Sequence, residues 1–244
     1  SHATSHYNLG LALTRNGQPE AAIREFRQGI TILQVRGMAV KAEMYFDLAV
    51  SLEKIGRLDD AETQYRNALD AAPAMARARL GLGNVYYAMG NADSAGTQFR
   101  RALKAQPDFT AAKIRLADML LIEKAYPEAI QLYNSALQER PEDMPRIQLN
   151  LGIVFSLMGQ LDDAVAQLDD AHAMLERERN SEMASQLARA WFELSDQLHF
   201  QGDVTEAIAC LQKALRLVPA DSVPAHEIQK RATEFATPDQ PRKQ

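Results

Sequence analysis

The chain has 244 residues, and its 32 acidic side chains outnumber its 27 basic ones, so the formal net charge is −5 and the pI is near 5.6. This balance provides no broad basic field for nucleic acid, and no apolar run approaches the roughly 18 residues of a membrane-spanning helix. A single cysteine excludes an internal disulfide bond.

Apolar residues recur with a helical period, in pairs of helices joined by tight turns. The segment 76–109 shows the arrangement clearly: Leu82 and Tyr86 lie four residues apart and so share one helical face. Gly90 then interrupts the helix, and a second periodic run stops near Pro107, which cannot continue a helix. The segment is therefore predicted to be a helix, a turn and a second helix.

The same arrangement recurs along nearly the whole chain. Ala49 lies 34 residues before Gly83, and Ala117 lies 34 residues after it. Because one helical hairpin cannot bury its own apolar face, we expect neighbouring hairpins to stack on one another. The predicted units are residues 3–36, 42–75, 76–109, 110–143, 145–178 and 181–221.

The end of the chain departs from the strict period. The residues added before the sixth unit keep a helical face, so its first helix is predicted to begin near Ser181. Residues 223–236 are predicted to form a capping helix, because a terminal repeat needs a polar outer face. We therefore expect a single array over residues 1–236, followed by a flexible tail, 237–244, that is too polar and proline-rich to pack.

No constellation of residues indicates catalysis. The acidic pairs Asp59–Asp60 and Asp162–Asp163 open second helices, where carboxylates favour the exposed N–H groups and the positive end of the dipole. His2 and His6 stand one turn apart without a third ligand type nearby. There is no phosphate-binding loop, nucleophile elbow or Cys/His framework. We predict a chain that is not an enzyme and has no cofactor and no metal site.

The repeat resembles the tetratricopeptide repeat family. The family pattern W-x2-L-G-x2-Y…A-x3-F…P is met by Leu82, Gly83, Tyr86, Ala95, Phe99 and Pro107, and its W-x2-L opening by Trp191 and Leu194. The resemblance implies an all-α fold, a right-handed α-α superhelix (solenoid) of six helix-turn-helix units plus a C-terminal capping helix. It also implies a non-catalytic scaffold for protein–protein interaction.

In this family the first helix of each unit lines a concave groove that holds extended peptides or partner helices. Transferred to this chain, the candidate groove residues are Phe46, Val50, Arg77, Leu80, Asn84, Tyr87, Ile114, Arg115, Asp118, Arg146, Leu149, Asn150, Ile153, Arg189 and Phe192. Arg77, Arg115 and Arg146 come from successive units and would form a positive ladder for carboxylates. The alternative is that these arginines are solvated or paired with carboxylates such as Asp118.

The apolar part of the predicted groove comes from Leu80, Tyr87, Ile114 and Leu149. Co-chaperones of the family bind Glu-Glu-Val-Asp tails through a lysine, asparagine and arginine set. Here Leu80 replaces the expected first lysine and Arg115 an expected asparagine, so this set is incomplete and heat-shock-tail binding is not predicted.

Three further functions stay open from the sequence. The first alternative is a regulatory or targeting module of a larger enzyme such as a glycosyltransferase or kinase. The second is an RNA-binding protein, because related arrays of helical hairpins bind RNA. The third is a scaffold that self-assembles into a homo-oligomer. The acidic balance opposes RNA, so the expected partner is a protein or peptide. The absence of a visible signal peptide favours the cytoplasm, with the periplasm open if an upstream signal was removed.

Overall fold

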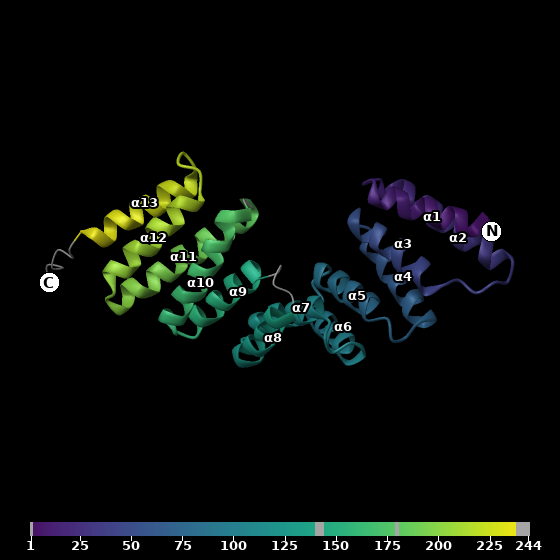
Figure 1. The fold of residues 1–244 in the computed structure, drawn as a ribbon, viewed down its shortest axis with the longest axis horizontal. Coiled ribbons are helices and arrows are strands. Elements are labelled where there is room, and N and C mark those ends of the chain that lie inside the picture. The colour runs from purple at the N-terminus through teal and green to yellow at the C-terminus, as the bar shows by residue number, and fades with distance from the viewer. Residues whose placement is uncertain (1, 140–143, 179–180, 238–244) are drawn as a thin grey trace. The chain divides into compact units, whose positions relative to one another are not determined.

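The computed structural model describes residues 2–139, 144–178 and 181–237, and within these ranges the chain forms thirteen α-helices and no strand (Figure 1). The prediction of an all-α fold is confirmed. The first helices of the hairpins are α1 (His2–Arg15), α3 (Ala42–Lys54), α5 (Ala76–Ala88), α7 (Thr110–Ile122), α9 (Met144–Leu157) and α11 (Ser181–Gln201). The second helices are α2 (Pro19–Val35), α4 (Leu58–Ala71), α6 (Ala92–Ala105), α8 (Tyr126–Glu139), α10 (Leu161–Glu178) and α12 (Val204–Leu217), and α13 (Val223–Ala236) follows them.

The chain divides into two compact units, residues 1–119 and 120–244, with the division inside α7. The single array over residues 1–236 stays a prediction. All but the first residue of the predicted tail, 237–244, lies outside the described residues.

In the N-terminal unit, α5 is held between the second helices of two hairpins, α4 and α6. Gly83 faces Phe99 of α6 so closely that a Cβ atom there would overlap the ring. Gly81 faces Tyr65 of α4 in the same way. Both rings are almost completely buried, so two glycines on one helix let aromatic side chains enter from both sides.

In the C-terminal unit, the core is centred on Trp191 of α11, which is fully buried. Lys213 of α12 lies 4.4 Å from the centroid of the indole ring, and its ammonium is 2.7 Å from a carboxylate oxygen of Asp169 on α10. The three helices are thereby joined by one cation–π and one ionic contact. The following helix, α13, packs on α12 and buries Ile228 and Phe235.

The turns within the hairpins share one backbone conformation. Five of them place a glycine in the left-handed region, and Gly90, with φ of 78°, is typical. In the fourth hairpin Lys124 occupies this place with φ of 61°. A side chain in this conformation costs about 1–2 kcal/mol relative to glycine, so the hairpin geometry prevails over the local preference of the residue.

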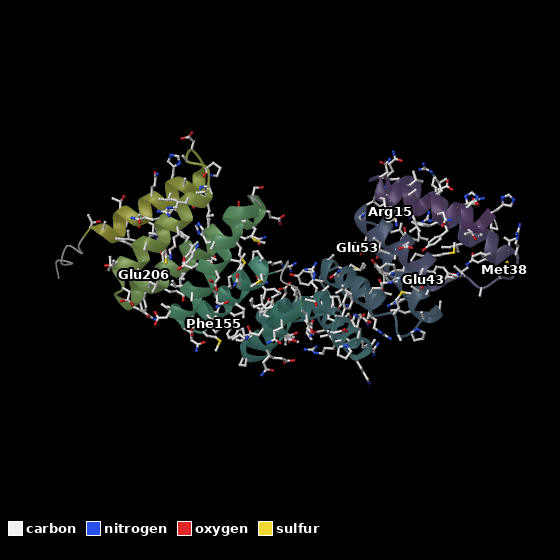
Figure 2. All side chains as sticks on the ribbon, viewed as in Figure 1. Arg15, Met38, Glu43, Glu53, Phe155 and Glu206 are labelled. Carbon is white, nitrogen blue, oxygen red and sulfur yellow. The ribbon has the colours of Figure 1, made fainter. Side chains whose placement is uncertain are left out.

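Acidic residues stand in the first turn of every second helix, as the sequence predicts. Figure 2 shows one of them, Glu206, in the first turn of α12. The hydrogen bond that caps α6 comes instead from Asn91, whose side chain accepts from the backbone N–H of Ser94 at 3.1 Å. The carboxylates in these first turns are placed to interact favourably with the positive end of the helix dipole.

Candidate functional site

The first helices of the N-terminal unit meet along one surface, which we call the first-helix surface. Two side-chain contacts join its helices: Tyr7 of α1 donates a hydrogen bond to Asp47 of α3 at 2.6 Å, and the guanidinium of Arg77 on α5 lies 4.6 Å from the centroid of Phe46 on α3. Phe46 is half-buried and its ring also lies 5.9 Å from that of Tyr65. Two of the predicted groove residues, Phe46 and Arg77, are thus in contact with each other.

Carboxylates surround Arg77 on this surface. Its guanidinium is 3.8 Å from Glu43, which Figure 2 labels near the start of α3. The pKa of Asp47 is raised, chiefly because the carboxyl group is partly buried and also because Glu43 is near, although the hydrogen bond from Tyr7 and the charge of Arg77 act in the opposite direction. Arg77 is therefore a compensating cation in an acidic environment, and the alternative of paired arginines holds here.

The raised pKa of Asp47 predicts a dependence of stability on pH. Because the folded state binds this proton more tightly than the unfolded state, the free energy of unfolding should fall as pH rises through the interval from about 4, the ordinary aspartate value, to the raised value. An Asp47→Asn variant keeps an acceptor for Tyr7 and should lack this fall. Urea unfolding at a series of pH values measures the difference.

The exposed Asp70 at the end of α4 provides the control. An Asp70→Asn variant should show the same fall as the wild-type chain. A slope that Asp47→Asn leaves unchanged would contradict the assignment.

Further along the first-helix surface, α5 and α7 bring together an amide, a phenol and a guanidinium. A small cavity of about 30 Å³ is lined by Asn84, Tyr87, Phe99, Arg115, Asp118 and Met119. Arg115 lies 3.9 Å from Asp118, and Tyr87 is 49% exposed. Four predicted residues therefore surround one point of the surface, and the arginine again stands beside a carboxylate.

In the C-terminal unit, the predicted residues Arg146, Asn150 and Ile153 lie on α9, and the latter two lie where it meets neighbouring helices. Asn150 is half-buried and donates a hydrogen bond to the hydroxyl of Tyr133 at 3.2 Å. Ile153 and Glu193 of α11 line a cavity of about 30 Å³. Arg146 is half-buried at the start of α9.

A larger groove lies between α11 and α13, and we call it the α11–α13 groove. It has a volume of about 490 Å³ and is lined by Ser185, Ala188, Arg189, Phe192, Glu193, Val218, Pro219, Ser222, Pro224, Glu227 and Ile228. Phe192 also lines an adjoining cavity of about 310 Å³, together with Glu227, Lys230, Arg231 and Glu234. The predicted residues Arg189 and Phe192 both belong to this groove.

The register between α11 and α13 sets where the groove lies. Asp196 pairs with Arg231 at 3.1 Å, and His199 stacks on Phe235 at 3.9 Å between ring centroids, so α11 and α13 run in the same direction. This register places the start of α13 opposite Ala188, about two turns after α11 begins. The first turns of α11 therefore have no partner on α13, and the loop before α13 closes the other side of the groove.

Two of the predicted groove residues are withdrawn from the surface. Ile114 and Leu149 are only 4% and 2% exposed, which corrects the prediction that they line an open groove. Seven of the fourteen residues of α9 are buried, because this helix packs against α8, α10 and α11. An inner helix thus exposes a narrower stripe than helical periodicity alone indicates. Val50 and Leu80 are half-buried.

Helix α13 contributes to the groove, which the sequence pattern does not predict. Glu227, Ile228 and Arg231 line the groove or its adjoining cavity, whereas residues 223–236 were expected only to cap the array. The available signal was the position of this segment after the sixth hairpin, where a seventh first helix would stand.

Reactive groups do not gather in the described part of the chain. Burial raises the pKa of the Cys210 thiol to about 12, so the thiol stays protonated at neutral pH. Within residues 2–139, 144–178 and 181–237, no three His, Cys, Asp or Glu side chains lie close enough together to hold a metal ion. None of the helices in these ranges combines the length and apolar character that crossing a membrane requires.

Comparisons with known proteins identify the repeat. Sequence models described as "Tetratricopeptide repeat" match residues 3–32, 46–99, 82–143, 120–189 and 188–221, which together span most of the chain. None of the curated proteins matches the chain.

Solved structures share the fold at low sequence identity. YrrB, described as a TPR protein with an unusual peptide-binding site, is 22% identical over 84% of this chain and 97% of its own, with a TM-score of 0.65. PilF of Pseudomonas aeruginosa is 19% identical over 94% of this chain and 97% of its own, with a TM-score of 0.69. MamA is 19% identical over 70% and 96%, with a TM-score of 0.60. The helices, the matched models and these likenesses confirm the predicted superhelical repeat fold, and the chain belongs to the tetratricopeptide repeat family.

Proposed function

We propose that the chain is a non-catalytic scaffold that binds an extended segment of a partner protein on its first-helix surface. Membership of the tetratricopeptide repeat family supports a role in protein interaction. The observation that carries the finer proposal is the cluster of Asn84, Tyr87 and Arg115 around one small cavity.

The three side chains suit an extended peptide. The amide of Asn84 both donates and accepts hydrogen bonds, so it can hold the N–H and C=O groups of a peptide backbone that has no other partner. Arg115 can take a carboxylate in bidentate geometry, in place of its 3.9 Å contact with Asp118. Tyr87 adds an exposed aromatic surface with a polar end. YrrB, whose description names a peptide-binding site, provides a precedent on the same fold.

An Arg115→Glu variant tests the proposal. Peptides selected by display against the full chain should bind it about tenfold more weakly than wild type, a loss of about 1.4 kcal/mol, because the charge at the centre of the cluster is reversed. Fluorescence anisotropy of the selected, labelled peptides measures the affinity.

The matched control is Arg101→Glu, which makes the same charge change at an exposed position of a second helix, α6. Its affinity for the same peptides should equal that of wild type. If both variants lose affinity equally, the loss comes from the change in net charge and not from the position of Arg115, and the proposal is wrong.

A further inference from the structure

We propose that the α11–α13 groove binds an amphipathic helix of a partner protein. The helix would present two bulky apolar residues one turn apart and a basic residue on the following turn. This inference rests on the proposed function, because it assigns a second partner segment to the same scaffold.

The groove has the size and lining of a binding site. Its volume of about 490 Å³ falls in the range of about 300–1,000 Å³ typical of ligand sites. Ala188, Phe192 and Ile228 provide apolar surface from the two helices, and Val218 and Pro219 provide it from the loop. Two apolar side chains from one face of a helix would cover this surface and remove it from water.

The hydrogen-bonding groups of the groove favour a helix over an extended peptide. No Asn or Gln lines it. The hydroxyl of Ser185 donates to the carbonyl of Ser181 at 3.0 Å, and that of Ser222 donates to the carbonyl of Pro219 at 2.6 Å. Apart from the charged side chains of Arg189, Glu193 and Glu227, the groove therefore offers few partners to the backbone N–H and C=O groups of an extended segment, whereas a helix satisfies these groups internally. The cluster around Asn84 on the first-helix surface offers the opposite chemistry.

The charges of the groove favour a basic residue on the partner. Arg189 is engaged by Glu193 at 2.8 Å, which leaves this pair neutral. Glu227 lines both the groove and the adjoining cavity, and it forms no ion pair with any residue in the described ranges. Lys230 lines only the adjoining cavity. The uncompensated charge within the groove is thus negative, and a lysine or arginine of the partner would meet Glu227.

A designed peptide tests the inference on the full chain. The probe is a fluorescein-labelled, lactam-bridged helix of about three turns, with two leucines one turn apart and a lysine on the next turn. We expect saturable binding by fluorescence anisotropy. Ser185→Trp, at an exposed position on the groove, should weaken binding about tenfold because the indole fills the groove.

Charge variants test the predicted contact between Glu227 and a basic residue of the partner. Glu227→Gln should weaken binding of the peptide about threefold. Gln229→Lys makes the same change in net charge at an exposed position of α13 that does not line the groove, and it should leave the affinity unchanged. Circular dichroism checks that each variant keeps the helical content of wild type.

The outcomes separate this inference from the proposed function. The inference is overturned if the peptide does not saturate the wild-type chain, if Ser185→Trp binds it equally well, or if an unbridged scrambled peptide binds as tightly. Arg115→Glu should leave binding of this peptide unchanged. A peptide that responds to Arg115→Glu and not to Ser185→Trp would place the helix on the first-helix surface and overturn the inference alone.

Discussion

Replacing Trp191 by alanine is expected to lower the free energy of unfolding of the C-terminal unit by about 3–5 kcal/mol. The indole is fully buried in the core that α10, α11 and α12 share. Its N–H has no hydrogen-bond partner among the described residues, so the loss is one of apolar burial and of the contact with Lys213. Denaturant unfolding should be followed by circular dichroism, because Trp191 is the chain's single tryptophan and its fluorescence disappears with it.

Phe200 provides the matched control on the same helix. Its side chain is 92% exposed, so Phe200→Ala should change the free energy of unfolding by less than about 0.5 kcal/mol. Trp191→Phe should retain part of the lost stability. Similar effects for Trp191→Ala and Phe200→Ala would be incompatible with a core centred on the indole.

The second large effect is expected from Gly83→Ala, which should cost about 2 kcal/mol. A methyl group at this position would overlap the buried ring of Phe99, and such overpacking typically costs about 1–3 kcal/mol, offset in part by the better helix propensity of alanine. The measurement is the free energy of unfolding of the N-terminal unit in a denaturant titration.

Gly96 provides the matched control for Gly83, because it lies in the same hairpin and is also within a helix. A Cβ atom there would meet only the end of the Arg100 side chain, at 3.3 Å, which can move aside. Gly96→Ala should therefore stabilise the unit by up to about 1 kcal/mol. The same chemical change is predicted to have opposite signs at the two positions, and a common sign would refute the packing argument. Phe99→Leu should relieve part of the cost of Gly83→Ala.

The fold could be predicted from the sequence because its determinants are local and repeated. Gly83 and Phe99 contact each other within one hairpin, and equivalent positions recur in successive hairpins, so each copy supports the others. Even the substitution of Lys124 for a turn glycine does not break the hairpin.

The candidate sites could be predicted only in part, because exposure depends on contacts between hairpins. Arg115 and Ile114 are neighbours in sequence, yet one lies beside a surface cavity and the other is buried. The α11–α13 groove depends on the register between Asp196 and Arg231, which no pattern within a single repeat encodes. Two of the arginine–carboxylate pairs, Arg77–Glu43 and Arg231–Asp196, likewise depend on helices brought together. The pairs Arg115–Asp118 and Arg189–Glu193 instead lie within one helix, where the sequence spacing alone favours them.

This pairing also affects how fast a partner can be captured. Arg77, Arg115, Arg189 and Arg231 each lie within 4 Å of a carboxylate of the same chain, so these four guanidinium groups contribute little field to guide an approaching acidic segment. Association should then proceed near the unsteered rate of about 10⁵–10⁶ M⁻¹s⁻¹ and respond weakly to ionic strength. Differences in affinity between partners would then come mainly from the dissociation rates of their complexes.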